Sequence, residues 1–489
     1  MRLAPLLLTL AATPLMAMET PITGARQLGM GASGTATTED HTVVWWNAAA
    51  LGWEARAEGG PHPTWGSIAP GGIGIEATAG FHAYGELLDN ADLLLDAAQR
   101  IKDLGTSGIA SKVDLHSFLR VAGQLNDLAN PADSLMAYGN VAGSMRFGRF
   151  AIGMRWAGET AAYADDIDLR NVIPDVTGVN LANQINASGQ SFDATLQVLN
   201  TSQRDQIYQA LGGTGAFGTV TAAADATLRV DDALQELGAA SPAAAEAATW
   251  LAATASGAGT LDQNTTSVVL NGFSYVEMPV SVGVPMNEYI ALGGSVKLMR
   301  GRVNGTRILV FQEDVEGAVA DLKGAYKDSL NLGIDLGLQA KAGSWRMGVS
   351  ATNLNAPTFA GPDNPDGPVR SVRLDPQVTI GLGWRPNDWF TISADIEQFN
   401  VSTINPAIES RRAGAGFEFA AIPWLDLRGG VYGNLADNQA PPVITAGAGL
   451  GPEAFRIDAA VACASELQDF GQWTLPTELR VAIGLSGRW

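Results

Sequence analysis

The chain has 489 residues, a formal net charge of −20, only 16% charged residues and 57 glycines. The acidic balance argues against a nucleic-acid partner, because phosphate groups require a basic protein surface. Low charge and abundant glycine argue against an ordinary soluble enzyme and are typical of a chain with many strands and turns.

Residues 1–17 have the pattern of a secretory signal peptide. Arg2 supplies the positive charge, residues 3–10 are apolar, and Ala17 is a suitable cleavage point. The alternative is a buried N-terminal helix, which the turn-rich sequence that follows disfavours. Beyond the signal, no apolar run is long enough for a membrane-spanning helix. We therefore expect an exported protein that no helix anchors.

Residues 18–60 are rich in glycine and other small residues. Gly29, Gly31 and Gly34 could suggest a phosphate-binding loop, but no Lys-Ser or Lys-Thr pair follows them. We instead expect a compact coil or short helix that packs inside another structure.

Residues 61–489 are interpreted as a barrel with helical insertions at 86–135 and 164–263. In the first part, residues 66–84 alternate as a strand, and the insertion that follows has apolar residues at helical spacing. It is expected to form two helices, at 86–104 and 113–128.

The second insertion follows a predicted hairpin of residues 140–147 and 151–156, which turns at Gly148-Arg149. The insertion is rich in Ala, Ser and Gly, and we interpret it as a helical subdomain. Its weak helical patterns fall at 192–200, 205–211, 222–237 and 243–254.

Strict alternation over residues 329–352 defines a strand hairpin with one apolar and one polar face. Leu330, Leu332 and Ile334 alternate with polar residues and glycine, and the pattern restarts at Trp345 after a short break. A soluble sandwich could solvate the polar face, and so could a membrane barrel with a wet lumen. Further strands are predicted at 266–284, 289–311, 376–384, 389–399, 411–419, 424–432, 443–450, 455–464 and 477–489.

The lengths of the connections distinguish these two folds. Along the chain, every second connection is short, provided that 289–311 is one long strand. The connections that alternate with these are longer and include both helical insertions and the long loops. Short turns on one side and long loops on the other are typical of an outer-membrane barrel. The predicted fold is therefore an all-β transmembrane protein, an antiparallel barrel of about fourteen strands with helical extracellular insertions.

The polar faces of the strands supply the candidate lumen-lining residues. Mixed charges need no catalytic reason inside a water-filled barrel. Asp395 and Glu397 could pair as acid and base, but hydration of the wall is the preferred interpretation. The candidate lumen-lining residues are Asp335, Arg346, Asp395, Glu397, Arg428, Arg456, Asp458 and Arg480.

No enzyme, metal site or cofactor is expected. The chain has 4 histidines and 1 cysteine, and it lacks the metalloprotease and nucleophile-elbow motifs. Cys463 continues an apolar strand face and is interpreted as a packing residue. Residues 363–367 could hold calcium, but a turn of this composition needs no ion.

Several stretches resemble known families. Residues 24–31, followed by Trp46-Asn47-Ala48-Ala49-Ala50-Leu51, are similar to the N-terminal segment of FadL-like outer-membrane barrels. Residues 331–337, 345–354, 374–378 and 427–434 resemble the family called plasmid transfer operon TraF, or conjugal transfer protein TraF. In FadL-like barrels the N-terminal segment plugs the lumen, and its movement opens a path for hydrophobic solutes. The resemblance implies that residues 18–60 form an N-terminal plug, with the candidate plug residues Arg26, Gly29, Gly31, Trp46 and Asn47.

Two functions are compatible with these features. The first is passage of a hydrophobic small molecule across the outer membrane of a Gram-negative-type bacterium. The second is a structural or interaction role in the cell envelope, conjugal-transfer-associated or adhesive, with 164–263 contacting a protein partner. In both, outer-membrane lipid surrounds the barrel.

Overall fold

The computed structural model describes residues 16–53, 71–85, 108–127, 132–168, 171, 180–215, 217, 221–238, 249, 251, 263–309, 326–364, 367–452, 454–470 and 473–489. Fourteen antiparallel strands pair in chain order, and the last pairs with the first to close a barrel. They are β1 Gly71–Tyr84, β2 Ser134–Phe147, β3 Phe150–Asp166, β4 Ser267–Pro285, β5 Ile290–Leu309, β6 Tyr326–Ala342, β7 Trp345–Thr352, β12 Gln377–Asn387, β13 Phe390–Glu397, β16 Arg412–Ile422, β17 Leu425–Asn434, β18 Val443–Leu450, β19 Arg456–Ala464 and β22 Glu478–Arg488.

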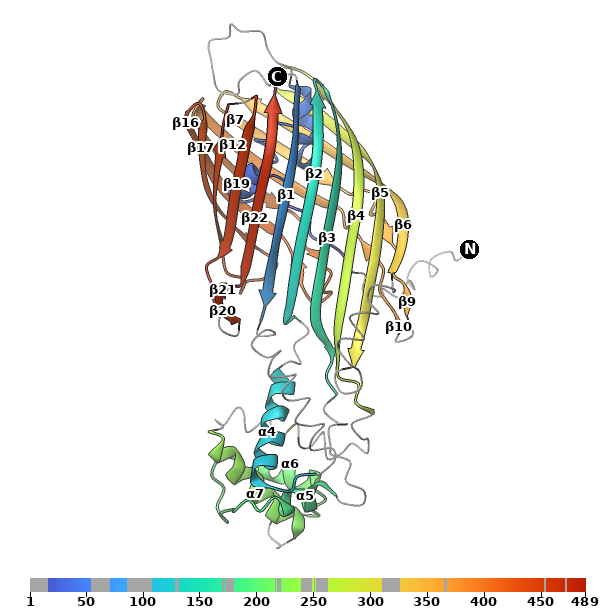
Figure 1. The fold of residues 1–489 in the computed structure, drawn as a ribbon, viewed down its shortest axis with the longest axis vertical. Coiled ribbons are helices and arrows are strands. Elements are labelled where there is room, and N and C mark those ends of the chain that lie inside the picture. The colour runs from blue at the N-terminus through green and yellow to red at the C-terminus, as the bar shows by residue number, and fades with distance from the viewer. Residues whose placement is uncertain are drawn as a thin grey trace, which may run out of the picture.

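The two ends of the barrel differ, as the connection lengths predict. The short turns lie at the end that holds the C-terminus, while the helices of the two insertions lie beyond the opposite end (Figure 1). Gly71 and Trp489 exchange backbone hydrogen bonds at the short-turn end, which joins the first strand to the end of the chain. The long-loop end carries four small hairpins, β8–β11 (Thr358–Phe359 with Val372–Arg373), β9–β10 (Asp363–Asn364 with Gly367–Pro368), β14–β15 (Val401–Ser402 with Glu409–Ser410) and β20–β21 (Leu467–Phe470 with Trp473–Pro476).

The prediction of one long strand at 289–311 is confirmed by β5, which pairs along its length with β4 and β6. The predicted fold of a fourteen-stranded antiparallel barrel is confirmed with it. β3 runs well beyond the predicted end at Trp156. Alanines and glycine dominate its second half and hide the alternation, but this half pairs with both β2 and β4.

The two faces of the wall have opposite chemistry, which positions both the membrane and the lumen. On β4 and β5, Val280, Val296 and Leu298 face outward and are exposed. Their neighbours Glu277 and Lys297 face inward and are buried. The free Cys463 lies partly exposed on the outward side of β19, between the buried Ala462 and Ala464. An apolar outer face around a polar interior is the arrangement of a barrel in lipid.

The described helices of the insertions share a buried core beyond the long-loop end. They are α4 Lys112–Asp127, α5 Leu181–Ala187, α6 Thr201–Ala210 and α7 Ala222–Glu236. Phe118, Ile185, Ile207 and Val230 are fully buried in this core. None of the described helices is long and apolar enough to cross a membrane.

One predicted helix in the second insertion, at 192–200, is wrong. Backbone N–H groups of residues 197–199 donate to the buried carboxylate of Asp231 on α7, so side-chain acceptors replace helical ones. Asn200 then caps α6 through a reciprocal capping box with Gln203. The predicted helices at 113–128, 205–211 and 222–237 correspond to α4, α6 and α7. Those at 86–104 and 243–254 lie outside the described residues, apart from single positions.

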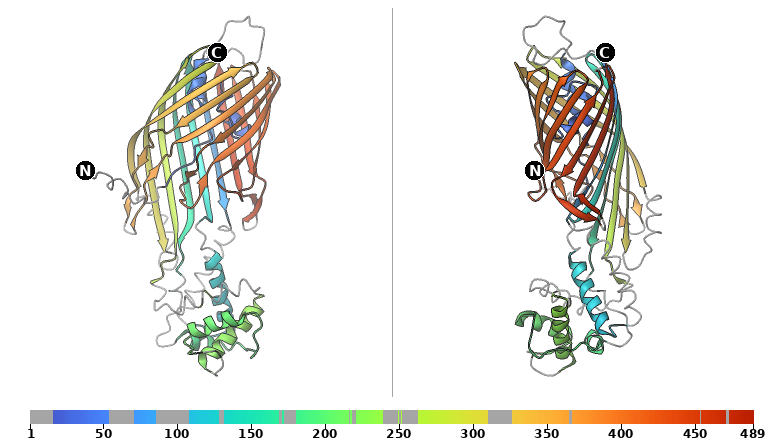
Figure 2. Two further views of the ribbon diagram at one scale, coloured as in Figure 1. Left: turned by 180° about the vertical axis from the view of Figure 1, so that it is seen from behind. Right: turned by 60° about the vertical axis from the view of Figure 1, so that its left-hand side comes forward.

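Within the barrel, residues 16–53 form short elements that cross the lumen. These are α1 Ala25–Gly29, α2 Val43–Trp46 and the 3₁₀ helix η1 Ala48–Gly52. Both views in Figure 2 show this segment, in blue, surrounded by the strands. We refer to residues 16–53 as the plug.

A charge on the outer face tests the orientation of the wall. Val280→Arg should destabilise the barrel by about 2–4 kcal/mol, because the arginine would sit in the hydrocarbon layer. Reversible unfolding from lipid vesicles measures the change. Thr306→Arg, beyond the apolar part of β5, is the control and should cost far less. Equal losses for the two variants would contradict the assigned membrane position.

Candidate functional site

The plug is anchored at both ends of the barrel. At the long-loop end of the unprocessed chain, the Met16 N–H donates to the Ser371 carbonyl at 3.2 Å, and the Arg373 N–H donates to the Met16 carbonyl at 2.8 Å. Glu19, which follows the predicted cleavage point at Ala17, pairs there with Arg480 at 3.4 Å. At the short-turn end, the Trp53 indole donates to Gln339 Oε1 at 2.8 Å. The described plug therefore spans the lumen from the loops to the turns.

Glycines in the wall let the plug backbone approach the strands closely. A Cβ atom placed on Gly293 of β5 would lie 2.2 Å from the Ala48 carbonyl carbon, and one on Gly337 of β6 would lie 2.1 Å from Asn47 Oδ1. Both distances are far shorter than a van der Waals contact. Other glycines where a Cβ would meet the plug are Gly74, Gly153, Gly283, Gly348, Gly381, Gly414, Gly416, Gly430 and Gly447.

The predicted plug residues Trp46 and Asn47 hold the plug together and attach it to the wall. The Trp46 indole donates to the Thr23 carbonyl at 2.8 Å. The Asn47 amide donates to carbonyl oxygens of the plug and of two strands, Thr35, Leu338 and Val349, at 3.1–3.2 Å. Its Oδ1 accepts from the Ala49 N–H and caps η1.

Gly29 and Gly31, also predicted for the plug, lie against β18 and β16. Thr445 of β18 accepts from the Gly31 N–H through its hydroxyl oxygen and donates to the Gly29 carbonyl, both at 3.1 Å. A Cβ on Gly414 of β16 would collide with the Gly31 carbonyl oxygen. One threonine therefore satisfies two plug groups that face the wall.

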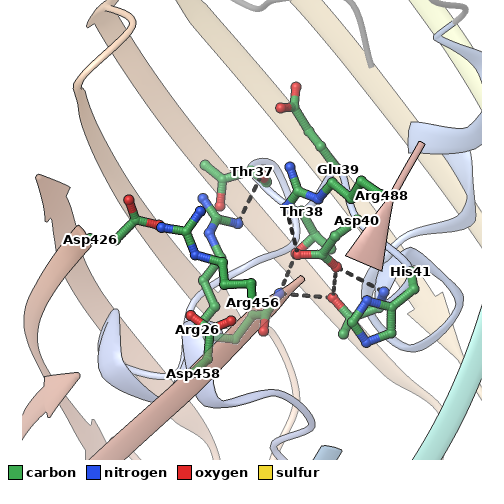
Figure 3. Close-up of polar contacts among 12 residues, drawn as sticks. Arg26, Thr37, Thr38, Glu39, Asp40, His41, Asp426, Arg456, Asp458 and Arg488 are labelled. Atoms are coloured by element: carbon green, nitrogen blue, oxygen red, sulfur yellow. Dashed lines mark hydrogen bonds and ion pairs between the residues drawn. The ribbon is translucent and has the colours of Figure 1, made fainter. Parts of the chain in front are cut away.

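Arg26, the remaining predicted plug residue, joins a chain of buried charges. Its guanidinium makes two hydrogen bonds to Glu418, at 2.8 and 2.9 Å. Arg428 bridges Glu418, Asp426 and Asp458 at 2.8, 3.0 and 2.5 Å, and it is almost fully buried. Arg456 in turn contacts Asp426 at 2.5 Å. Figure 3 shows Arg26 of the plug together with Asp426, Arg456 and Asp458 of the wall.

A second set of charges involves Glu39 and Asp40 of the plug. Glu39 contacts Arg346 at 2.9 Å and Arg385 at 3.2 Å, and Asp40 contacts Arg488 at 3.4 Å. Burial alone would raise the pKa of Glu39, but Arg385 and Arg346 outweigh it and lower the pKa to about 2. The two arginines therefore favour the ionised form of the Glu39 carboxylate.

The other predicted lumen residues have separate partners. Asp395 accepts from the Gly34 and Thr35 N–H groups of the plug, both at 2.9 Å. Glu397, its neighbour on β13, pairs with Arg412 at 3.0 Å. The two carboxylates thus hold different groups and do not converge as an acid–base pair. Asp335 pairs with Lys297 at 3.0 Å, and Arg480 with Glu478 at 2.6 Å.

Around the plug, the space is small. Three cavities lined by both plug and wall residues have volumes of about 30, 20 and 20 Å³. Each has room for about one water molecule. Among the described residues, no group of three or more His, Cys, Asp or Glu side chains could hold a metal ion.

Sequence reasoning missed an apolar region at the long-loop end of the lumen, which we call the apolar chamber. Strands, loops and the start of the plug all contribute to it. Its buried residues are Met16, Met18, Met136, Ala157, Ala161, Tyr163, Phe273, Tyr275, Met299, Val303, Phe359, Val372, Leu374, Ile404 and Ile408. It also missed the plug partners Glu39 and Glu418, although the inward position of Glu418 follows from the alternation of β16.

The fold and the filled lumen define a plugged β-barrel of the outer-membrane type. The family described as "F plasmid transfer operon, TraF, protein" matches residues 44–397. The chain therefore belongs to this family. An uncharacterised protein family also matches residues 330–486. No curated protein matches the chain.

Solved structures with a similar fold include outer-membrane channels. The toluene transporter TodX of Pseudomonas putida is 11% identical with a TM-score of 0.44, and the alignment covers 95% of this chain and 98% of that one. A FadL homologue of Pseudomonas aeruginosa is 11% identical with a TM-score of 0.41, covering 97% and 98%. These values describe a distant likeness of fold.

A side chain at Gly293 should displace the plug. Gly293→Val places carbon atoms where the Ala48 backbone lies, so we expect larger ion conductance in planar bilayers and faster proteolysis of the plug. Gly294→Val is the matched control, because the adjacent residue faces outward and its Cβ would meet nothing closer than 3.4 Å. A closed, protease-resistant Gly293→Val barrel would contradict the close packing of plug and wall.

Loss of the Glu39 charge should loosen the same segment by another route. Glu39→Gln leaves Arg346, which is 1% exposed, and Arg385 without their shared carboxylate. Breaking a buried pair in this way costs about 3–5 kcal/mol. Thermal unfolding in detergent should show the loss, whereas Glu288→Gln in an exposed turn should show none. Equal melting temperatures would mean that these charges do not hold the plug.

Proposed function

We propose that this protein admits a small hydrophobic molecule through the outer membrane of a Gram-negative-type bacterium. The observation that carries the proposal is the apolar chamber. Elsewhere in the described lumen, ion pairs and hydrogen bonds lie beside two smaller apolar clusters in which plug and wall pack together. This end instead combines four methionines with aromatic and aliphatic side chains in a larger apolar cluster.

The chamber has the composition of a site for an apolar ligand. The Phe273 ring lies 5.0 Å from that of Phe359 and 5.5 Å from that of Tyr275, measured between ring centroids. Met299 and Val303 of β5 are fully buried beside them. Ligand sites are commonly apolar and aromatic, with few polar groups to fix orientation.

The side-chain amide of Asn271 provides such a polar group. The Asn271 amide donates to the Met16 sulfur at 3.1 Å and to the Tyr163 hydroxyl at 2.8 Å. A thioether is a weak acceptor, so a ligand oxygen in its place would make a stronger hydrogen bond with Asn271. The preferred ligand is therefore apolar with at most one hydrogen-bond acceptor.

Processing of the chain would make room in the chamber. Met16 is fully buried there, and it precedes the predicted cleavage point at Ala17. Cleavage would remove the Met16 side chain together with its hydrogen bonds to the 371–373 loop segment. In the processed protein the chamber would then accept a ligand, with Met18 at the start of the plug beside it.

The alternative is an interaction role for the second insertion, and the buried core that its helices share with α4 favours keeping it. α5, α6 and α7 pack on one another and on α4 beyond the barrel end (Figure 1). Deletion of 164–263 would abolish partner binding under this alternative and leave solute entry intact under the first. Deletion of residues 24–52 should leave partner binding intact, but it should change solute entry and enlarge ion conductance.

Filling the chamber tests the transport proposal directly. Ala157→Phe adds a ring to a fully buried inward position of β3. We expect a severalfold loss of entry of the apolar dye N-phenyl-1-naphthylamine into vesicles that contain the processed protein. Ala162→Phe, on the outward face of the same strand, is the control and should leave entry unchanged. Unaltered entry through Ala157→Phe would exclude the chamber as the path.

A further inference from the structure

The outer surface of strands β2–β6 carries a trough that the strand register explains. Gly139 of β2 pairs with Gly158 of β3, Gly158 pairs with Ser274 of β4, and Ser274 pairs with Arg302 of β5. The outward-facing row across β2, β3, β4 and β5 therefore contains two glycines and a serine, followed by the arginine. Three neighbouring strands lack a large side chain at the same height, and this forms the floor of the trough.

Larger side chains border the floor on the short-turn side. The next outward row in that direction contains Val141, Trp156, Val276, Arg300 and Leu330. The Trp156 ring lies over the floor, because a Cβ on Gly139 or Gly158 would meet it at 3.3 or 3.1 Å. The cavity that remains has a volume of about 480 Å³ and is also lined by Asn304 and Tyr326.

The trough lies where the apolar outer face of the barrel ends. On β5, Val296 and Leu298 are exposed apolar residues, and the next two outward residues are Arg300 and Arg302. On β6, Leu332 and Leu330 give way to Asp328 in the same direction. This change occurs toward the long-loop end, so the trough faces the boundary between the hydrocarbon layer and the outer headgroups.

The exposed charges at the rim of the trough have a net positive sum, while the other charged lining residue, Glu159, is buried on the inward side of β3. Arg300 contacts Asp328 at 2.9 Å, and Arg302 contacts the same carboxylate at 2.8 Å. Two guanidinium groups thus share one carboxylate, and their side chains are 70% and 47% exposed. The Arg302 guanidinium also stacks on the Tyr326 ring, 3.8 Å from its centroid. This stacking fixes Arg302 at the rim of the trough.

We propose that the trough binds the headgroup of a phosphorylated glycolipid of the outer leaflet. The Trp156 ring provides a flat apolar platform for a sugar ring on the side-chain-free floor. Arg302 and Arg300 are placed to donate to a phosphate, for which guanidinium groups are well suited. The acyl chains would continue over Val276, Leu298 and Leu330 toward the middle of the membrane. The proposal is independent of what the lumen transports.

Native mass spectrometry of the full-length protein in detergent tests this binding. The probes are diphosphoryl lipid A, phosphatidylglycerol and inorganic phosphate, each titrated separately. We expect lipid A to remain bound at concentrations where phosphatidylglycerol dissociates, because only lipid A offers both a sugar and a phosphate. Equal retention of phosphatidylglycerol, or no retention of lipid A, would overturn the proposal. Competition by millimolar inorganic phosphate alone would also overturn it by showing a simple anion site.

Two variants test separately whether lipid A binding needs the charge of Arg302 and the open floor at Ser274. Arg302→Gln should weaken lipid A binding about tenfold, since a charge-assisted hydrogen bond is lost. Ser274→Leu should weaken it comparably by filling the floor while retaining every charge. Arg307→Gln is the control, because Arg307 lies on β5 beyond the trough and pairs with Asp165. Wild-type affinity in both Arg302→Gln and Ser274→Leu, with folding verified by heat-dependent gel mobility, would refute the site.

Discussion

The lumen depends on one constraint, that a charge enclosed by the barrel needs a partner of opposite charge. The strands alone do not meet it. Arg346 and Arg385 both contact Glu39 of the plug, and Arg488 contacts Asp40 of the plug. Arg26 of the plug adds a second guanidinium to Glu418, which Arg428 of the wall also contacts. The plug thus contributes a charge to each of these groups. Because an unpaired buried charge is costly, the plug is part of the folded barrel rather than an insert added to it.

The same dependence explains why the wall is rich in glycine on its inner face. Ion pairs of about 3 Å require the plug to lie within reach of side chains on several strands at once. Asn47 can hydrogen-bond to backbone carbonyl oxygens of β6 and β7 only because Gly337 leaves its side of β6 bare. A path through this half of the lumen therefore requires coordinated loss of charge pairs and backbone contacts.

The sequence carries the fold more clearly than the site, for physical reasons. Alternation and the parity of short turns depend on neighbours along the chain, and they predicted fourteen strands and the single strand β5. The inward side of Arg428 or Asp395 follows from the same alternation. Their partners do not, because pairing Arg26 with Glu418 requires the path of the plug. The apolar chamber was missed because Met16, Phe273 and Ile404 come from a plug, a strand and a loop.

The two zones of the lumen imply how an apolar ligand could act on the plug. Burial of apolar surface yields roughly 25 cal/mol per Å², whereas breaking a buried ion pair costs about 3–5 kcal/mol. A small ligand in the chamber therefore cannot overcome several plug–wall ion pairs directly. A ligand bound there as proposed would compete for space with Met18, whose neighbour Glu19 contacts Arg480 and donates its N–H to Glu159. Displacement would then begin at the start of the plug and reach Arg26 and Glu39 only later, and the apolar end would be the ligand-sensitive part of a mostly ionic closure.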